Sequence, residues 1–132
     1  MRKAYLIAAV LAIVTSCCKT ANNVISVVPY PNEVEIKCGS FNAAGADFFI
    51  YEGVDEASAN VIKDFAESLS TASGQDCVIT DRNSGKGFIF VMNSEMPAEA
   101  YSIKVGRKAV EISASSLNGM NYAIQTIKQM LP

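Results

Sequence analysis

The chain has 132 residues, of which 50% are hydrophobic and 18% charged, and its formal net charge is −2. This composition is typical of a folded globular protein, and the length suits one domain. A slightly acidic chain lacks the excess of lysine and arginine that contacts phosphate backbones, so nucleic acid is not an expected partner. Because there is no histidine, the commonest zinc ligand and general base is missing, and we expect no metal and no other cofactor.

The first residues have the features of a bacterial export signal. Arg2 and Lys3 precede the apolar run Ala4 to Val14, which is too short to cross a bilayer core of ~30 Å as a helix. The run leads into Val14-Thr15-Ser16-Cys17, which resembles the lipobox of bacterial lipoproteins, where the cysteine is acylated. We therefore predict a lipoprotein signal peptide over residues 1–16, lipidation of Cys17, for example with palmitate, and a polar tether over residues 17–24. An ordinary secretory signal is the alternative.

The rest of the chain carries strand and helix patterns. Alternating apolar and polar residues, and β-branched or aromatic runs, predict strands, whereas apolar residues at helical spacing predict helices. In chain order we expect strands over Val34–Cys38 and Asp47–Tyr51, a helix over Glu56–Ser70, strands over Cys77–Thr80, Gly87–Met92, Tyr101–Val105 and Val110–Ser113, and a helix from about Asn118 to Pro132.

The arrangement of these elements predicts an α+β fold. The strands Tyr101–Val105 and Val110–Ser113 form a hairpin, which favours a mixed or antiparallel sheet over a doubly wound parallel one. Phe88 to Met92 has no polar side chain, so this strand should be central and covered on both faces. We expect a two-layer sandwich in which two helices pack on a mixed sheet of about six strands. In the last helix, Ala123, Ile127 and Met130 should contact the sheet.

Four segments together resemble one known family. They are Pro29-Tyr30-Pro31-Asn32-Glu33, then the strands Glu99-Ala100-Tyr101-Ser102-Ile103 and Val110-Glu111-Ile112-Ser113-Ala114, and finally Gly119-Met120-Asn121-Tyr122-Ala123-Ile124-Gln125-Thr126-Ile127-Lys128-Gln129-Met130-Leu131. Glu99 to Ile103 is similar to an "EAY.I.V" strand, and Gly119 to Leu131 is similar to a "G..YA.QTL.QLL" helix. Both are found in the N-terminal non-catalytic domain of glycoside hydrolase family 20, the bacterial β-N-acetylhexosaminidases. The resemblance covers about Ile25 to Pro132.

The resemblance implies an accessory role. In that family the domain packs beside a (β/α)₈ barrel, and a barrel glutamate and aspartate hydrolyse the glycosidic bond with help from the substrate's acetamido group. None of the barrel is among these 132 residues. We therefore expect no catalytic residue and no activity in this chain alone. The barrel of a parent enzyme would be its partner, and terminal β-linked N-acetylhexosamine of glycans would be reached only through that parent.

Several residue groups invite a chemical interpretation. Asp55-Glu56 is an acidic pair, but it opens the predicted helix and is better explained as a cap. Cys38 and Cys77 could form a disulfide in an oxidising envelope, or stay as two buried thiols. Gly85-Lys86-Gly87 lacks the spacing of a phosphate-binding loop and suits a plain turn. A set of aromatic residues could stack sugars, although core packing explains it better: Phe48, Phe49, Tyr51, Phe88, Phe90, Tyr101 and Tyr122.

Two other functions stay open. One is a self-sufficient envelope lipoprotein that binds a glycan or a protein without hydrolysis. The other is the similar N-terminal domain of a family 84 β-N-acetylglucosaminidase or an α-glucuronidase. In each case the expected location is the cell envelope, with the lipid anchor holding the protein at a bacterial membrane.

The lipid anchor can be tested directly. A bacterial culture that expresses the chain and is fed labelled palmitate should incorporate label into the wild-type protein and not into Cys17→Ser, because only an acylated cysteine retains the fatty acid. Equal label in both proteins would move the modification to another residue. No label in the wild type would rule out the lipoprotein interpretation.

Overall fold

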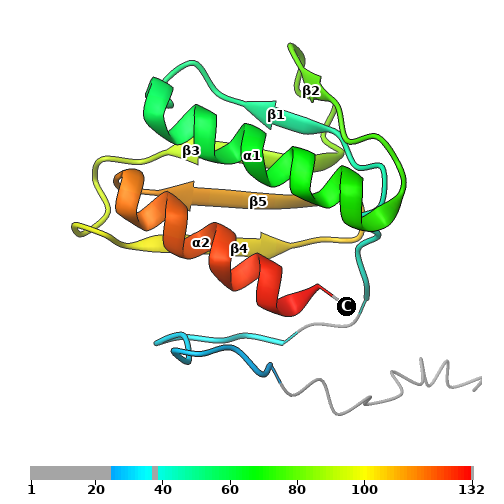
Figure 1. Cartoon of the computed structure of the whole chain (residues 1–132). Helices are drawn as coiled ribbons and strands as arrows, with labels where there is room; N and C mark the ends of the chain where they lie inside the picture. Colours follow the sequence, from blue (N-terminus) through cyan, green and yellow to red (C-terminus); the bar gives the residue numbers. More distant parts are fainter. Residues whose placement is uncertain (1–24, 37–38, 132) are drawn as a thin grey trace, which may run out of the picture.

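The computed structural model describes residues 25–36 and 39–131, which form two layers (Figure 1). The strands are β1 (Phe48–Ile50), β2 (Ile79–Thr80), β3 (Gly87–Met92), β4 (Tyr101–Val105) and β5 (Ala109–Ala114), and the helices are α1 (Glu56–Ser73) and α2 (Leu117–Met130). Both helices lie on the same face of the sheet. The signal peptide, the tether and Cys17 lie outside the described residues.

The sheet is mixed, and the predicted α+β sandwich is confirmed. Its strand order is β2-β1-β3-β5-β4. Neighbours pair in parallel except for β4 and β5, which form the predicted antiparallel hairpin with Tyr101 opposite Ala114 and Val105 opposite Val110. The bounds of β3 and β4 agree with the sequence prediction.

The prediction of a first strand over Val34–Cys38 is wrong for residues 34–36, which are the part of it that the structure describes. Val34 to Ile36 have no strand conformation, and Lys37 and Cys38 lie outside the described part. This segment runs beside α2 instead of joining the sheet (Figure 1). Ile36 is 56% exposed, so the alternation of apolar and charged residues does not mark a buried face here. Within the described residues the sheet has five strands, one fewer than expected.

Helix α1 is bounded by two clear caps. The Asp55 side chain accepts a hydrogen bond from the Ser58 backbone N–H at its start, and Gly74 ends it in a left-handed conformation with φ of 70°. Only glycine adopts this conformation at no steric cost. The helix extends three residues past the predicted Ser70. Its buried stripe includes Ile62 and Phe65.

An aromatic cluster joins α1 to the sheet. Phe65 contacts Phe48 of β1 and Phe88 of β3, with ring centroids 5.5 and 5.6 Å apart. Strand β3 lies in the middle of the sheet, as predicted, and its Phe88 and Phe90 are fully buried toward the helices. Ile89 points to the opposite face, which no described helix covers, and is 8% exposed. Phe49 of β1 and Glu111 of β5 lie beside Ile89 in register. Side chains of the sheet itself, and not a second layer of helices, therefore cover Ile89 on that face.

Helix α2 buries a stripe against the sheet. Ser116 caps it by accepting a hydrogen bond from the Gly119 N–H, and Met120, Ala123, Ile124 and Ile127 are almost inaccessible. The prediction is therefore confirmed for Ala123 and Ile127. It is wrong for Met130, which is 38% exposed, because the helix ends there and its last turn passes beyond the sheet. Lys128 crosses to α1, with its ammonium 5.9 Å from the centre of the Phe65 ring.

We predict that Ile127→Asp destabilises the domain by several kcal/mol, because it would bury an unpaired charge where Ile127 is only 3% exposed. Met130→Asp is a matched control in the same helix and should cost less than ~1 kcal/mol, since that side chain reaches solvent. Urea unfolding followed by circular dichroism measures both. Equal midpoints would show that α2 does not pack through this stripe.

Candidate docking surface on helix α2

The exposed face of α2 carries a single charged residue, Lys128. Tyr122 is 48% exposed and Met130 38% exposed, and Gln125 and Gln129 lie exposed between them. Tyr122, Gln125 and Gln129 recur at intervals of three and four residues, which places them along one side of the helix. Gln129 on this side contacts the segment 25–36, which lies beside α2 (Figure 1).

Gln129 fixes that N-terminal segment to α2. Its side-chain amide donates to the Val28 carbonyl oxygen at 3.1 Å, and its amide oxygen accepts from the Val28 N–H at 2.9 Å. The paired bonds satisfy the Val28 backbone as a neighbouring strand would. Val27 is buried beside this contact, whereas Val28 is 79% and Tyr30 65% exposed. We define the docking surface as Val28, Tyr30, Tyr122, Gln129 and Met130.

The motif residues of the last helix divide into two groups. Some hold this domain together. A Cβ on Gly119 would lie 2.6 Å from the Ala100 carbonyl oxygen, so only glycine allows α2 to approach that loop. Asn118 donates to a Glu99 carboxylate oxygen at 3.0 Å, and the hydroxyls of Tyr101 and Thr126 share a hydrogen bond of 2.8 Å. Tyr122 and Gln125 have no comparable role within the domain, since both are exposed.

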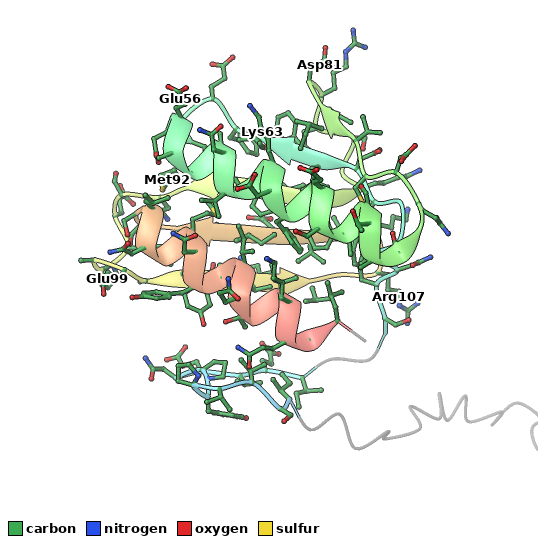
Figure 2. The ribbon with its side chains drawn as sticks, in the orientation of Figure 1. Glu56, Lys63, Asp81, Met92, Glu99 and Arg107 are labelled. Carbon is green, nitrogen blue, oxygen red and sulfur yellow. The ribbon has the colours of Figure 1, made fainter. Side chains whose placement is uncertain are left out.

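The acidic pair Asp55-Glu56 forms a helix cap, as the sequence predicted. The Ser58 hydroxyl donates to one Asp55 carboxylate oxygen at 2.7 Å and the Ser58 N–H to the other at 3.0 Å. These bonds, the hydroxyl's first, lower the pKa of Asp55 below its ordinary value of 3.8. Glu56 is exposed in the first turn of α1 (Figure 2). A carboxylate that is held ionised at an open helix end is unsuited to act as a general acid at neutral pH.

The cysteine predictions can be followed only in part. Cys77 is half-buried and forms no disulfide within the described residues, and its sulfur lies 3.9 Å from the Gln75 carbonyl oxygen. Cys38 lies outside the described residues, so the Cys38–Cys77 disulfide stays a prediction. Lipidation of Cys17 stays a prediction for the same reason. Neither described helix is long and apolar enough to cross a membrane.

The aromatic residues are not all in the core. Phe48, Phe88 and Phe90 are buried as expected. Phe49 and Tyr51 instead form an edge-to-face pair, with centroids 4.9 Å apart and Tyr51 43% exposed. Tyr122 lies on the docking surface. Core packing is the wrong explanation for Tyr122, and its position next to Ala123 and off the Met120–Ile127 stripe could have shown this. The Gln129 contact had no sequence signal, because it joins residues 101 positions apart.

Comparisons with known proteins give a consistent result. A structure of an exo-β-N-acetylglucosaminidase from Vibrio harveyi in complex with N-acetylglucosamine is 28% identical, with a TM-score of 0.65 over 80% of this chain and 16% of that one. A β-N-acetylhexosaminidase from Streptomyces coelicolor A3(2) is 24% identical, with a TM-score of 0.67 over 77% of this chain and 20% of that one. The structure titled CpGH84D shares the fold, at 13% identity and a TM-score of 0.59 over 83% of this chain and 22% of that one. The search of curated proteins found no match.

The fold and the motifs define an accessory α+β domain of the kind found in glycoside hydrolases. The family model described as glycosyl hydrolase family 20, domain 2, matches residues 24–132, and the chain belongs to this family. It spans a fifth or less of the two family 20 structures above, 16% and 20% of their lengths.

The Asp55 cap predicts a pH dependence. Because folding lowers this pKa below 3.8, the ionised cap contributes stability above about pH 4, and the contribution is lost as the pH falls through 3.8 and below. Asp55→Ala should lose about 1 kcal/mol at pH 7, and Asp55→Asn, whose single amide oxygen still accepts one of the two Ser58 bonds, should lose less. In urea unfolding from pH 7 to 2.5, the gap between wild type and Asp55→Ala should shrink. A constant gap would contradict the charged cap.

Proposed function

We propose that this chain is the non-catalytic accessory domain of a lipid-anchored β-N-acetylhexosaminidase and that it braces the catalytic barrel. The parent enzyme would remove terminal β-linked N-acetylhexosamine from glycans in the cell envelope. Membership of family 20 supports the choice of parent over family 84, since the likeness to CpGH84D at 13% identity concerns the fold alone.

The observation that carries the proposal is the exposed half of the α2 motif. A motif that served only this domain would specify residues that the domain itself uses. Gly119 and Thr126 meet that condition, whereas Tyr122 is 48% exposed and makes no hydrogen bond within the described residues. Tyrosine is among the residue types that are enriched where two protein surfaces meet.

The outer face of β4 and β5 does not offer the same kind of surface. On β4 and β5 the outward residues are Lys104 and Glu111, which are exposed and lie opposite each other in register. Charged residues are depleted from the centres of interfaces. The barrel is therefore expected to pack against α2 and segment 25–36, and the outer face of β4 and β5 to stay in water.

The anchor would keep the enzyme close to its membrane. The predicted tether from Cys17 to Val24 has eight residues, so it reaches at most about 30 Å when fully extended. Several acyl chains would make release negligible. The active site of the parent would thus work on glycans near the membrane surface.

We predict that Tyr122→Glu uncouples the domain from the barrel. In a protein extended from Pro132 through the barrel of its coding sequence, the variant should lose about 2 kcal/mol of stability, because a buried interface tyrosine is replaced by a charge. In the isolated chain the same variant should melt close to wild type, since Tyr122 is exposed there. Differential scanning calorimetry of both forms gives the comparison.

Ser94→Glu is the control, because it adds the same charge to an exposed turn after β3. It should leave both forms unchanged. If Tyr122→Glu and Ser94→Glu behave alike in the extended protein, α2 does not contact the barrel. If the codons after Pro132 encode no barrel, the self-sufficient binding lipoprotein is favoured instead.

A further inference from the structure

A basic hollow lies at the edge of the sheet where the parallel strands β1, β3 and β5 begin. This open hollow has a volume of about 280 Å³, and its lining includes Lys86, Arg107 and Lys108 together with residues of the loop 41–47. Figure 2 shows Arg107 at this end of the molecule, far from Glu99 and Met92. Asp47 is the one acidic residue that lines it, so the hollow is locally positive on a chain whose net charge is −2.

The three cations come from two loops that the backbone holds together. The Gly87 N–H donates to the Lys108 carbonyl oxygen at 2.9 Å, which links the turn before β3 to the β4–β5 hairpin. The Phe88 N–H in turn donates to the Asp47 carbonyl oxygen at 2.8 Å. Gly87 has φ of 80°, and a Cβ there would lie 2.2 Å from that Asp47 oxygen. The approach of the three segments therefore depends on glycine, and the hollow is preformed.

The floor of the hollow is also fixed. Phe41 packs edge-to-face on Phe88 with centroids 5.2 Å apart, and the Asn42 side chain accepts from the Ala44 N–H at 3.1 Å. The Arg107 side chain lies across Gly39, where a Cβ would be 3.2 Å from its Cγ and Nε atoms. Backbone rigidity of this kind reduces the entropy that a ligand must offset on binding.

The three positive charges are unpaired within the part of the domain that the structure describes. Across residues 25–36 and 39–131, the side chains of Lys86, Arg107 and Lys108 form no ion pair or hydrogen bond. Three neighbouring cations repel one another, and a bound anion relieves that repulsion while the guanidinium offers a fork that matches oxyanion geometry. All three are exposed, so they suit an anionic group presented from solvent on a larger molecule.

We propose that this hollow binds an oxyanion group, sulfate or carboxylate, carried on a glycan. The choice of a glycan as carrier rests on the proposed function, because the parent would act on glycans. The charge and the geometry of the hollow do not depend on that function. The domain would then hold an anionic part of a polysaccharide at a place separate from the docking surface on α2.

The test measures binding of a heparin-derived hexasaccharide to the chain by isothermal titration calorimetry. The triple variant Lys86→Gln, Arg107→Gln, Lys108→Gln should weaken binding about tenfold, since each exposed charge contributes modestly. The control triple Lys63→Gln, Arg82→Gln, Lys104→Gln removes the same net charge from other exposed positions and should stay within about twofold of wild type. Circular dichroism checks that all three proteins are folded.

A second measurement locates the contact. Titration with the hexasaccharide should shift backbone amide resonances of residues 42–47, Gly87 and Lys108, and neutral chitohexaose should not. The proposal is overturned if both triple variants lose affinity equally, if shifts spread over the whole surface, or if chitohexaose binds as well. It is also overturned if phosphatidylglycerol vesicles bind in a Lys86-, Arg107- and Lys108-dependent way and the hexasaccharide does not. None of these outcomes bears on whether α2 contacts a barrel, which calorimetry of Tyr122→Glu decides.

Discussion

The position of α2 depends on one close approach, between Gly119 and the carbonyl of Ala100. A side chain at residue 119 would collide with that oxygen at 2.6 Å, so the missing Cβ sets how near the helix can come to the loop before β4. The same carbonyl accepts the Ser115 N–H at 3.1 Å, which secures the turn from β5 into the helix. With Gly119 in contact with Ala100, Asn118 forms a hydrogen bond with Glu99, and Thr126 forms one with Tyr101. The two sequence motifs are thus the two halves of one contact.

This contact has a backbone cost at Glu99. Its φ of 62° lies in the left-handed region, which a glutamate seldom adopts. The loop must turn sharply to present the Ala100 carbonyl to the helix, and the hydrogen bond from Asn118 to the Glu99 side chain offsets part of the strain. The aromatic cluster of Phe48, Phe65 and Phe88 supplies the bulk of the burial but does not fix the register of α2. The polar contacts in the first turn of α2, such as that of Asn118 with Glu99, fix the position of the helix along the sheet.

Much of the fold could be predicted from local patterns, and the failures have physical causes. β3 and β4 follow from apolar runs and alternation, and the start of α1 follows from its Asp55 cap. The segment Val34 to Ile36 has the alternation of a strand but lies beside a helix, because a pattern cannot say whether a sheet edge is within reach. Met130 has the right helical spacing yet extends past the sheet. The basic hollow joins loops that are distant in sequence, so Lys86 and Arg107 could be recognised individually only as turn residues.

The Gln129 contact places two connections on the same end of one helix. Val28, which the chain reaches soon after the predicted tether, is held by Gln129, and Leu131 follows two residues later with its N–H donating to the Ile127 carbonyl at 3.1 Å. Whatever precedes Ile25 and whatever follows Leu131 therefore attach to the last turn of α2. A force on the N-terminal segment would act on the two hydrogen bonds between Gln129 and Val28. The close contact of Gly119 with Ala100 would hold the other end of the helix in place. In a membrane-anchored enzyme this arrangement would bring the end of the tether and the start of the downstream chain together at the last turn of α2.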